Sequence, residues 1–353
     1  MPPTSTHFSI RAIPSAGRGV LASTPLAPNT PLILSPPPAA HVIFRQYRRE
    51  VCAHCLYYDR GRTLPVRDAP TGKVFCAEPC RAAWRETQGA LGIEAWTALE
   101  TFVRSRAKGV VSTLAQAAVG AKPGAQAVAA TWEGAAEVGA LHARARGGVG
   151  GAADSGPGIK ADREYRRALH HVWTQSVDPD ILGYLLSGVL TAHGDAGYWE
   201  REVEGLAMDE EAYKDTADLE AHCNAFLQLV ATVPRELVGS CTVEVCQTLA
   251  NASSHNSFGI RAGGDEGEEY MGYALYPEAS YFNHSCAPSV RKKRVGRQWE
   301  FSTAREVGEG EELCITYLGG DEKDLTVTER RERLRGVWGF ECMCERCRRE
   351  DTS

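Results

Sequence analysis

The sequence predicts an α+β protein in which short strands at both ends enclose a helical middle. Residues 7–50 alternate as short strands broken by Pro and Gly, and residues 256–318 return to short strands and glycine turns. Between them, residues 162–250 carry apolar side chains at helical spacing, such as Leu169 and Val172. With 353 residues, the chain is long enough for two or more domains and at least one sizeable core.

The N-terminal strands are expected at residues 8–10, 19–22 and 31–34, within a segment bounded at 5–50. A glycine-flanked turn, Gly17-Arg18-Gly19, opens the second strand. Since glycine lacks a Cβ atom, the backbone of this turn could approach a ligand closely. The same pattern is typical of turns that do no more than reverse the chain, so both interpretations stay open.

Eight of the twelve cysteines fall in groups whose spacing is typical of metal sites in a reducing compartment. One group lies in a small module at residues 51–88, as Cys52-x2-Cys55 and Cys76-x3-Cys80. Two close pairs of thiols commonly hold a tetrahedral zinc ion between two loops. The sequence between the pairs is short, polar and rich in turns, which leaves little core for free cysteines. The remaining cysteines lie in apolar surroundings and are expected to be buried small hydrophobic residues: Cys223, Cys241, Cys246 and Cys314.

A second cysteine group lies near the C-terminus, where Cys342, Cys344 and Cys347 offer three thiols within six residues. A structural zinc ion takes four ligands. No cysteine or histidine follows Cys347, so the fourth ligand must come from upstream. Cys286, which ends the sequence Asn-His-Ser-Cys, is the natural donor and completes a second predicted zinc site.

This metal link would fold the tail, residues 321–350, back over the strand-like residues 310–317, which end in a tyrosine. Taken singly, Tyr317 is more typical of a core residue than of a catalyst. The link would bring three further residues to it: Asn283, His284 and Phe340. Such convergence is typical of an active site.

The middle of the chain is divided by composition. Residues 89–160 are rich in Ala and Gly, and the glycine-rich end of this insertion cannot bury enough surface to offset its ordering entropy. We therefore expect the insertion to be partly flexible, with a helix in its alanine-rich part. Residues 161–255 form the helical region, and residues 256–320 form the second set of strands.

Two charged segments near the C-terminus have simple structural interpretations. Residues 321–335 are typical of a charged helix, with Thr328 as the expected N-cap before Glu329. The basic run at 291–294 matches a nuclear localisation patch. It lies between two strand-like segments, however, so the solvated face of a hairpin is favoured.

Composition and charge exclude several classes of protein. The net charge of -6 argues against general nucleic-acid binding, which needs a basic face. No apolar run approaches the roughly 20 residues needed to span a bilayer, and the N-terminus lacks the pattern of a secretory signal. We therefore expect a cytoplasmic or nuclear protein. The acidic stretches at 209–211 and 265–269 could steer a basic peptide, although a solvated surface fits them better.

Together these motifs resemble those of the SET and MYND domain protein-lysine methyltransferases. The resemblance covers residues 8–88 and 160–350 and leaves out the Ala/Gly insertion. The matching pieces are, in order, Gly17-x-Gly19, the cysteine module, Asn256-Ser257-Phe258-Gly259-Ile260, residues 275–288, 310–317 and 328–334, and Phe340-Glu341-Cys342-x-Cys344-x2-Cys347. Several of these motifs are rare alone, and they occur in the family's order.

The resemblance implies a SET fold of small β-sheets with a knot-like threading, in which the 283–286 segment and the tyrosine strand cross. Such threading is an exception to the rule against knotted chains. It also implies S-adenosylmethionine as the methyl donor and Tyr317 as the catalytic residue. The residues that the resemblance implies in donor binding are Gly17, Arg18, Gly19, Asn256, Ser280, Asn283, His284, Tyr317 and Phe340.

The chain departs from the family pattern in three ways. The family's MYND module binds two zinc ions, whereas only the ligand set of Cys52, Cys55, Cys76 and Cys80 is found, so a reduced but folded module is expected. Ser289 stands where the family usually has Asn, a change expected to be tolerated. The chain ends at Ser353, and the C-terminal helical-repeat domain of larger members is expected to be absent.

Two functions are compatible with these observations. The first is a protein-lysine N-methyltransferase that acts on histone or non-histone lysines; the second is a zinc-stabilised adaptor that kept the fold without turnover. The presence of Asn283, His284, Tyr317 and Phe340 favours the enzyme. We expect a monomer whose partners are a lysine-bearing protein or peptide and other proteins, including chromatin, with neither nucleic acid nor membrane as a partner.

Overall fold

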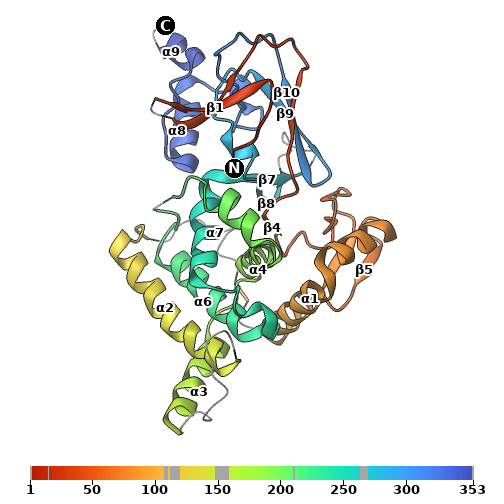
Figure 1. Cartoon of the computed structure of the whole chain (residues 1–353), viewed down its shortest axis with the longest axis vertical. Helices are drawn as coiled ribbons and strands as arrows, with labels where there is room; N and C mark the ends of the chain where they lie inside the picture. The colour runs from red at the N-terminus through yellow and green to blue at the C-terminus, as the bar shows by residue number, and fades with distance from the viewer. Residues whose placement is uncertain are drawn as a thin grey trace. The chain divides into compact units, whose positions relative to one another are not determined.

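The computed structural model of the chain describes residues 2–14, 16–106, 110–111, 120–147, 159–209, 211–262 and 269–351 (Figure 1). The glycine-rich part of the predicted flexible insertion at 148–158, and most of the acidic stretch at 265–269, lie outside these residues. The described residues combine helices and small antiparallel sheets, which confirms the α+β class. They form two compact units, which are described in turn.

The first unit comprises residues 1–38, 205–207 and 254–353 and consists mainly of strands. Two antiparallel hairpins pair β1 (Phe8–Ile13) with β2 (Gly17–Ala22), and β7 (Ser257–Arg261) with β8 (Tyr270–Leu275). In a third sheet, β10 (Gln298–Thr303) lies between β3 (Pro31–Leu34) and β9 (Val290–Val295), antiparallel to both. The basic run at 291–294 lies in β9, as the hairpin interpretation predicted.

Two segments without regular structure join these sheets and carry the predicted active-site residues. His284 and Ile315 form a parallel β-bridge, in which the Ile315 amide donates to the Asn283 carbonyl oxygen at 2.9 Å. Upstream, the Leu313 amide donates to the carbonyl oxygen of Val20 in β2 at 2.7 Å. The 283–286 segment and the tyrosine segment therefore lie side by side, whereas the knot-like threading stays a prediction.

An aromatic core packs around Phe282, the residue that precedes the 283–286 segment. Phe282 is fully buried, and its ring lies 4.7 Å from that of Phe301 and 6.0 Å from that of Phe8. Phe258 extends this core, with its ring 5.6 Å from that of Trp299. Since apolar burial is the main stabilising contribution in a small unit, this packing fixes the backbone on which Asn283 and His284 sit.

The C-terminal part of the first unit is helical. The 3-10 helix η5 (Asp321–Lys323) precedes α8 (Val327–Trp338), and α9 (Glu345–Asp351) ends the described chain. The predicted N-cap Thr328 is wrong: Thr326 caps α8 in a capping box with Glu329. The reason is the spacing of this motif, in which the acidic residue stands three positions after the cap.

The second unit comprises residues 39–204 and 208–253 and begins with strand β4 (Ala40–Ile43). The cysteine module follows, with the antiparallel pair β5 (Val66–Asp68) and β6 (Lys73–Phe75). It continues into α1 (Glu78–Ser105; orange in Figure 1), which kinks at Gly89, where φ is 63°. This helix was not predicted from the sequence.

The other helices of the second unit fall mostly in the region predicted as helical. The alanine-rich segment forms α2 (Ala125–Ala145), as predicted. The remaining elements are α3 (Ile159–Thr174), α4 (Pro179–Gly194), α5 (Ala196–Tyr198), the π-helix η2 (Trp199–Val203), α6 (Thr216–Thr232), the 3-10 helix η3 (Arg235–Leu237) and α7 (Val243–Asn256), whose last residues belong to the first unit. Within the described ranges, every helix is too short or too polar to cross a bilayer.

Candidate active site

Four thiols gather at the C-terminal end of the first unit, as predicted. The sulfur atoms of Cys286, Cys342, Cys344 and Cys347 all lie within 4.8 Å of one another, and we call these residues the C-terminal cluster. The Cys286 Sγ is 3.8 Å from that of Cys342 and 3.5 Å from that of Cys347. Four thiols at this spacing match the ligand number and donor type of a structural zinc site.

Nitrogen donors surround this cluster. The Arg330 side chain is fully buried, with Nη2 3.6 Å from the Cys347 Sγ and Nη1 donating to the Leu325 carbonyl oxygen at 2.6 Å. Arg346 donates to the carbonyl oxygen of Cys286 at 3.1 Å. Positive charge and N–H groups next to sulfur favour the thiolate form that binds a metal ion.

Tyr317 is held at both ends beside the cluster. Its amide donates to Nδ1 of His284 at 3.0 Å, and its hydroxyl donates to the Phe282 carbonyl oxygen at 3.0 Å. Its ring lies 5.3 Å from His284, 5.4 Å from Trp338 and 6.3 Å from Phe340. The predicted convergence on Tyr317 is therefore observed for His284 and Phe340, whereas the Asn283 side chain bonds Arg18 and Glu312 instead.

Burial sets the protonation of this group. It raises the pKa of the Tyr317 phenol well above its ordinary value of 10, so the hydroxyl keeps its proton near neutral pH. It lowers the pKa of His284 to about 4, so that imidazole is neutral under the same conditions. The site thus presents the protonated, uncharged hydroxyl of Tyr317 among aromatic rings.

Asn283 is oriented by two acceptors. Its Nδ2 donates to the Arg18 carbonyl oxygen at 3.1 Å and to Oε1 of Glu312 at 2.8 Å. Both amide hydrogens are therefore used, and Oδ1 has no hydrogen-bond partner among the described residues. A Cβ atom on Gly19 would lie 2.7 Å from the Glu312 Oε1 and 2.8 Å from the Asn283 Nδ2. The glycine turn thus packs directly on the oriented amide.

The remaining predicted donor-binding residues form a neighbouring group around residues 205–207. The Arg18 guanidinium donates to the Gly205 carbonyl oxygen at 2.6 Å and to the Tyr281 hydroxyl at 3.3 Å. Asn256 donates to the Ala207 carbonyl oxygen at 2.8 Å, and the hydroxyl of Ser280, on the 3-10 helix η4 (Ala279–Tyr281), lies 2.7 Å from the carbonyl oxygen of Tyr276 and 3.2 Å from that of Asn256. These residues connect to Asn283 through Arg18, and no described hydrogen bond joins them directly to Tyr317.

The Ser289 departure is accommodated by hydrogen bonds. The buried Ser289 hydroxyl donates to the Glu312 carbonyl oxygen at 3.1 Å and accepts from the Cys314 amide at 3.0 Å. A small polar side chain at position 289 therefore holds the backbone of the tyrosine segment at residues 312–314. That serine is tolerated at this position stays a prediction.

Sequence reasoning missed three parts of the site. Glu312 orients Asn283 and Trp338 packs on Tyr317, yet neither was singled out. Their signals were present, since Glu312 lies in the tyrosine motif and Trp338 stands two residues before Phe340. Residues 205–207 gave no signal, because only the folded chain brings them to Arg18 and Asn256.

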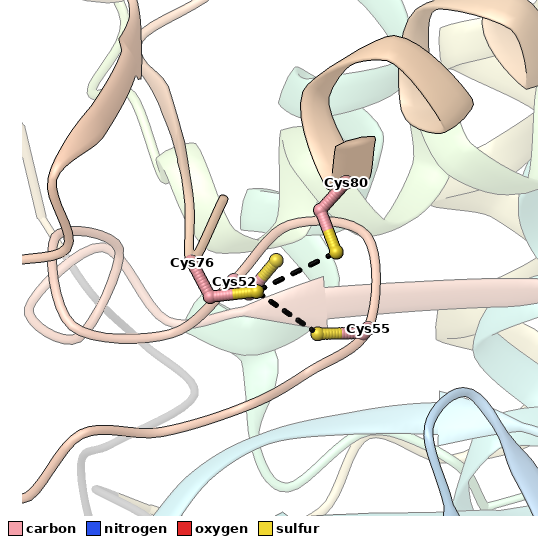
Figure 2. Close-up of side chains that lie close together, drawn as sticks. All are labelled: Cys52, Cys55, Cys76 and Cys80. Carbon is pink, nitrogen blue, oxygen red and sulfur yellow. Dashed lines mark hydrogen bonds between the residues drawn. The ribbon is translucent and has the colours of Figure 1, made fainter. Parts of the chain in front are cut away.

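The second cysteine group lies in the second unit, in the small cysteine module at residues 51–88 (Figure 2). The sulfur atoms of Cys52, Cys55, Cys76 and Cys80 lie within 4.8 Å of one another, and we call these residues the N-terminal cluster. The Cys76 Sγ is 3.6 Å from that of Cys55 and 3.5 Å from that of Cys80. Three ligands come from loops and Cys80 comes from the first turn of α1, so one metal ion would tie the loops to a helix. The four other cysteines are buried, as predicted: Cys223, Cys241, Cys246 and Cys314.

Comparison with known proteins relates this chain to one family. Residues 17–318 match the SET domain. A potential protein lysine methyltransferase of Saccharomyces cerevisiae, SET6, is 36% identical over 127 residues, which is 35% of this chain and 34% of the yeast protein. A SET and MYND domain-containing protein of Dictyostelium discoideum is 31% identical over 110 residues, 31% of this chain and 27% of that protein.

A mouse histone-lysine N-methyltransferase, SMYD3, is 41% identical over 81 residues, 23% of this chain and 18% of the mouse protein. The matched segments thus span about a third or less of each of these relatives. The SET domain match, in contrast, covers most of the chain and includes the glycine turn, the Asn283–Cys286 segment and Tyr317. The chain belongs to the SET domain family.

Proposed function

We propose that this protein is an S-adenosylmethionine-dependent protein-lysine N-methyltransferase. The observation that carries the proposal is the contact of His284 with Tyr317 beside the C-terminal cluster, next to an Asn283 amide that Glu312 orients, within a chain that belongs to the SET domain family. Three of its relatives also bear names of lysine methyltransferases or SET and MYND domain proteins. The substrate is a lysine side chain of a histone or of another protein.

The residues present fit the amino-acid end of the methyl donor. Asn283 uses both amide hydrogens within the protein, so it offers only an oxygen acceptor, which suits an ammonium group. Gly19 keeps this surface free of a side chain, and Phe340 adds an aromatic face beside His284. S-adenosylmethionine would supply a methyl group already activated on a sulfonium, so no nucleophilic side chain is required.

The aromatic group around Tyr317 fits the acceptor lysine. A free lysine has a pKa of about 10.4, and its amine must be neutral to attack the methyl group. Apolar and aromatic walls disfavour the ammonium form by desolvation, and Tyr317 and Trp338 would supply such walls. The Tyr317 hydroxyl, which keeps its proton, would orient the amine by hydrogen bonding and is not assigned as a general base. Alignment at about 3–3.5 Å is then the main contribution to catalysis.

Both cysteine clusters are proposed to hold zinc in structural roles. Each offers four thiols and no open position for water, which is the ligand set of a closed structural site. In the C-terminal cluster, Cys286 would join the Asn283–His284 segment to the tail that carries Phe340. Zinc there would supply a tetrahedral link, and the chain's own residues would do the binding and orientation.

The proposal is tested first by donor binding. Isothermal titration of the zinc-loaded protein with S-adenosylmethionine should show saturable binding to one site. Absence of binding would favour the adaptor hypothesis. Incubating a whole-cell lysate with purified protein and tritiated donor, and then identifying labelled bands, would next identify the substrate.

Tyr317→Phe separates catalysis from binding. Loss of the hydroxyl should lower kcat by about 100-fold, in the range of a lost positioning or proton-handling group. Donor affinity should stay close to wild type, because the Phe ring keeps the contacts with His284 and Trp338. An equal loss of donor binding and turnover would mean that the residue is structural.

A further inference from the structure

Both ring nitrogens of His284 are engaged by the protein itself. Nδ1 lies 3.0 Å from the amide nitrogen of Tyr317, and Nε2 lies 3.2 Å from the sulfur of Cys286. The ring also packs between aromatic neighbours, 5.3 Å from Tyr317 and 6.1 Å from Phe340. The imidazole therefore spans the distance between the tyrosine backbone and the C-terminal cluster.

These contacts fix the position of the imidazole proton. A backbone N–H can only donate, so Nδ1 must accept from Tyr317 and carries no hydrogen. A neutral imidazole with a bare Nδ1 has its hydrogen on Nε2. The Nε2–H group therefore points at Cys286, where it can donate to the sulfur. A thiolate coordinated to a metal ion accepts such a bond better than a free thiol.

We propose that His284 is a positioning residue whose imidazole ties the backbone of Tyr317 to the Cys286 sulfur, so that metal in the C-terminal cluster holds the tyrosine in place. The effect of this connection on turnover rests on the proposed function. The role given to the His284 imidazole goes beyond that function. With both nitrogens used, the ring has no polar atom left for the methyl donor. Any donor contact at His284 must then come from its backbone.

Two substitutions can cut this connection at one end each. In His284→Asn, the side-chain amide reaches the position of Nδ1 and can still accept from the Tyr317 amide, but it is too short to reach Cys286. In His284→Gln, the longer amide reaches the position of Nε2 and can donate to Cys286, but it leaves the Tyr317 amide without an acceptor. The matched controls are His7→Asn and His7→Gln, at a half-buried histidine of the same unit whose ring forms no hydrogen bond with any described residue.

The first readout is zinc release to a chromogenic chelator, measured in a Cys76→Ser background so that the C-terminal cluster alone reports. His284→Asn should weaken zinc retention by about 10-fold or more, the usual effect of losing a partner of a metal ligand. His284→Gln should retain zinc nearly as well as the parent. The thiolate-to-metal charge-transfer band of the cobalt-substituted protein should shift in the Asn variant and stay in place in the Gln variant.

The second readout is hydrogen exchange at the Tyr317 amide, followed by mass spectrometry. His284→Gln should speed this exchange relative to the parent protein by about 2–10-fold, as expected for one lost hydrogen bond. While zinc is bound, exchange in His284→Asn should be no faster than in the parent. In methyl transfer, His284→Gln should lower kcat with little change in the donor KM. If the protein methylates nothing, the exchange and release measurements still decide the inference.

Two outcomes would overturn the assignment. Equal changes in zinc release and Tyr317 exchange in both variants would make the ring a packing element without directional bonds. A raised donor KM in both variants, with zinc release and amide exchange unchanged, would place the imidazole against the methyl donor instead.

Discussion

Gly19 has no room for a side chain, and this gives a direct test of the donor site. A methyl group there would collide with Asn283 and Glu312, at 2.8 and 2.7 Å. Gly19→Ala should therefore displace the Asn283 amide and weaken S-adenosylmethionine binding by about 10-fold or more, or about 1.4 kcal/mol. Titration calorimetry of both proteins would measure the change.

Gly308→Ala is the matched control, because the nearest atom to a Cβ there is 3.9 Å away, at the Glu311 Oε2. This variant should bind the donor like the parent. If Gly19→Ala did so too, the turn would be no more than a chain reversal.

At the scale of single residues, the sequence predicted ligands better than their partners. Counting thiols was enough to select Cys286 as the fourth member of the C-terminal cluster, since a tetrahedral site needs four donors. The partner of Asn283 could not be found in this way. Glu312 reaches it only because the 283–286 and 310–317 segments pair side by side, and no local pattern specifies that contact.

Helix α8 supports the C-terminal cluster through a buried arginine. Arg330 is fully buried and bonds the Leu325 carbonyl oxygen, the Cys347 sulfur and the Glu350 carboxylate. Arg330→Met would remove the side-chain donor to the Leu325 carbonyl oxygen and to the Cys347 sulfur, while Glu350 would keep the hydrogen bond from Arg346 Nε at 2.7 Å. Hydrogen bonds to charged groups contribute about 1.5–3 kcal/mol, so the variant should lose at least about 2 kcal/mol of unfolding free energy. Chemical denaturation of the zinc-loaded protein would measure the loss.

Arg333 on the same helix is the comparison. Its ion pair with Asp321 is exposed on both sides, and such pairs contribute about 0.2–1 kcal/mol. Arg333→Met should therefore change the unfolding free energy little. Equal losses in the two variants would mean that helix α8 responds to charge removal in general and not to the cluster.

Helix α2 contains a group that makes stability depend on pH. His142 is fully buried against Tyr165 of α3, and neither ring nitrogen makes a hydrogen bond of ordinary geometry with a described residue. Burial lowers the pKa of His142 below its ordinary 6.5; the backbone of Ala168 acts in the opposite direction and the Arg146 charge acts in the same direction as burial. The unfolded chain therefore binds this proton more tightly than the folded one.

The stabilising contribution of neutral His142 should thus be complete above about pH 6.5 and be lost as the pH falls below it. His142→Phe keeps the aromatic contact and removes the titration. Denaturation midpoints of the parent should fall between pH 7.5 and 5.5 by more than those of the variant. If the midpoints of the two proteins changed in parallel with pH, His142 would not be taking up a proton when the chain unfolds.

At the scale of elements, periodicity predicted most strands and helices, and it failed where tertiary contacts decide. The short alternating runs became β1, β2 and β3, and the helical spacing of Leu169 and Val172 became α3. Helix α1 was missed because Gly89 kinks it and because its composition changes gradually from the cysteine module to the alanine-rich part. The Thr326 cap was misplaced by two residues, since only the capping box distinguishes it from Thr328.

The chain divides into two compact units whose boundaries could not be predicted from the order of the sequence segments. The first unit is assembled from three separate stretches, and residues 205–207 belong to it although the chain on both sides lies in the other unit. Contacts between distant segments are set by packing and leave no trace in local composition. The linear segments bounded at 5–50, 51–88, 89–160, 161–255, 256–320 and 321–350 stay predictions about sequence regions.

The division into two units makes the two cysteine clusters separable by mutation. All the proposed donor-binding residues and the C-terminal cluster belong to the first unit, whereas the N-terminal cluster belongs to the second.

Cys344→Ser and Cys76→Ser should each lower the zinc content from two ions to one. Cys344→Ser should also weaken S-adenosylmethionine binding, because the tail that carries Phe340 loses its link to Cys286. Cys76→Ser should leave donor affinity near that of the parent, since the four thiols that would hold the lost metal ion belong to the second unit and the proposed donor-binding residues belong to the first. Metal analysis and titration calorimetry on the same samples would measure both quantities. Unchanged donor affinity in Cys344→Ser would remove the proposed role of the C-terminal cluster, and equal weakening in both variants would mean that the clusters act through the stability of the whole chain.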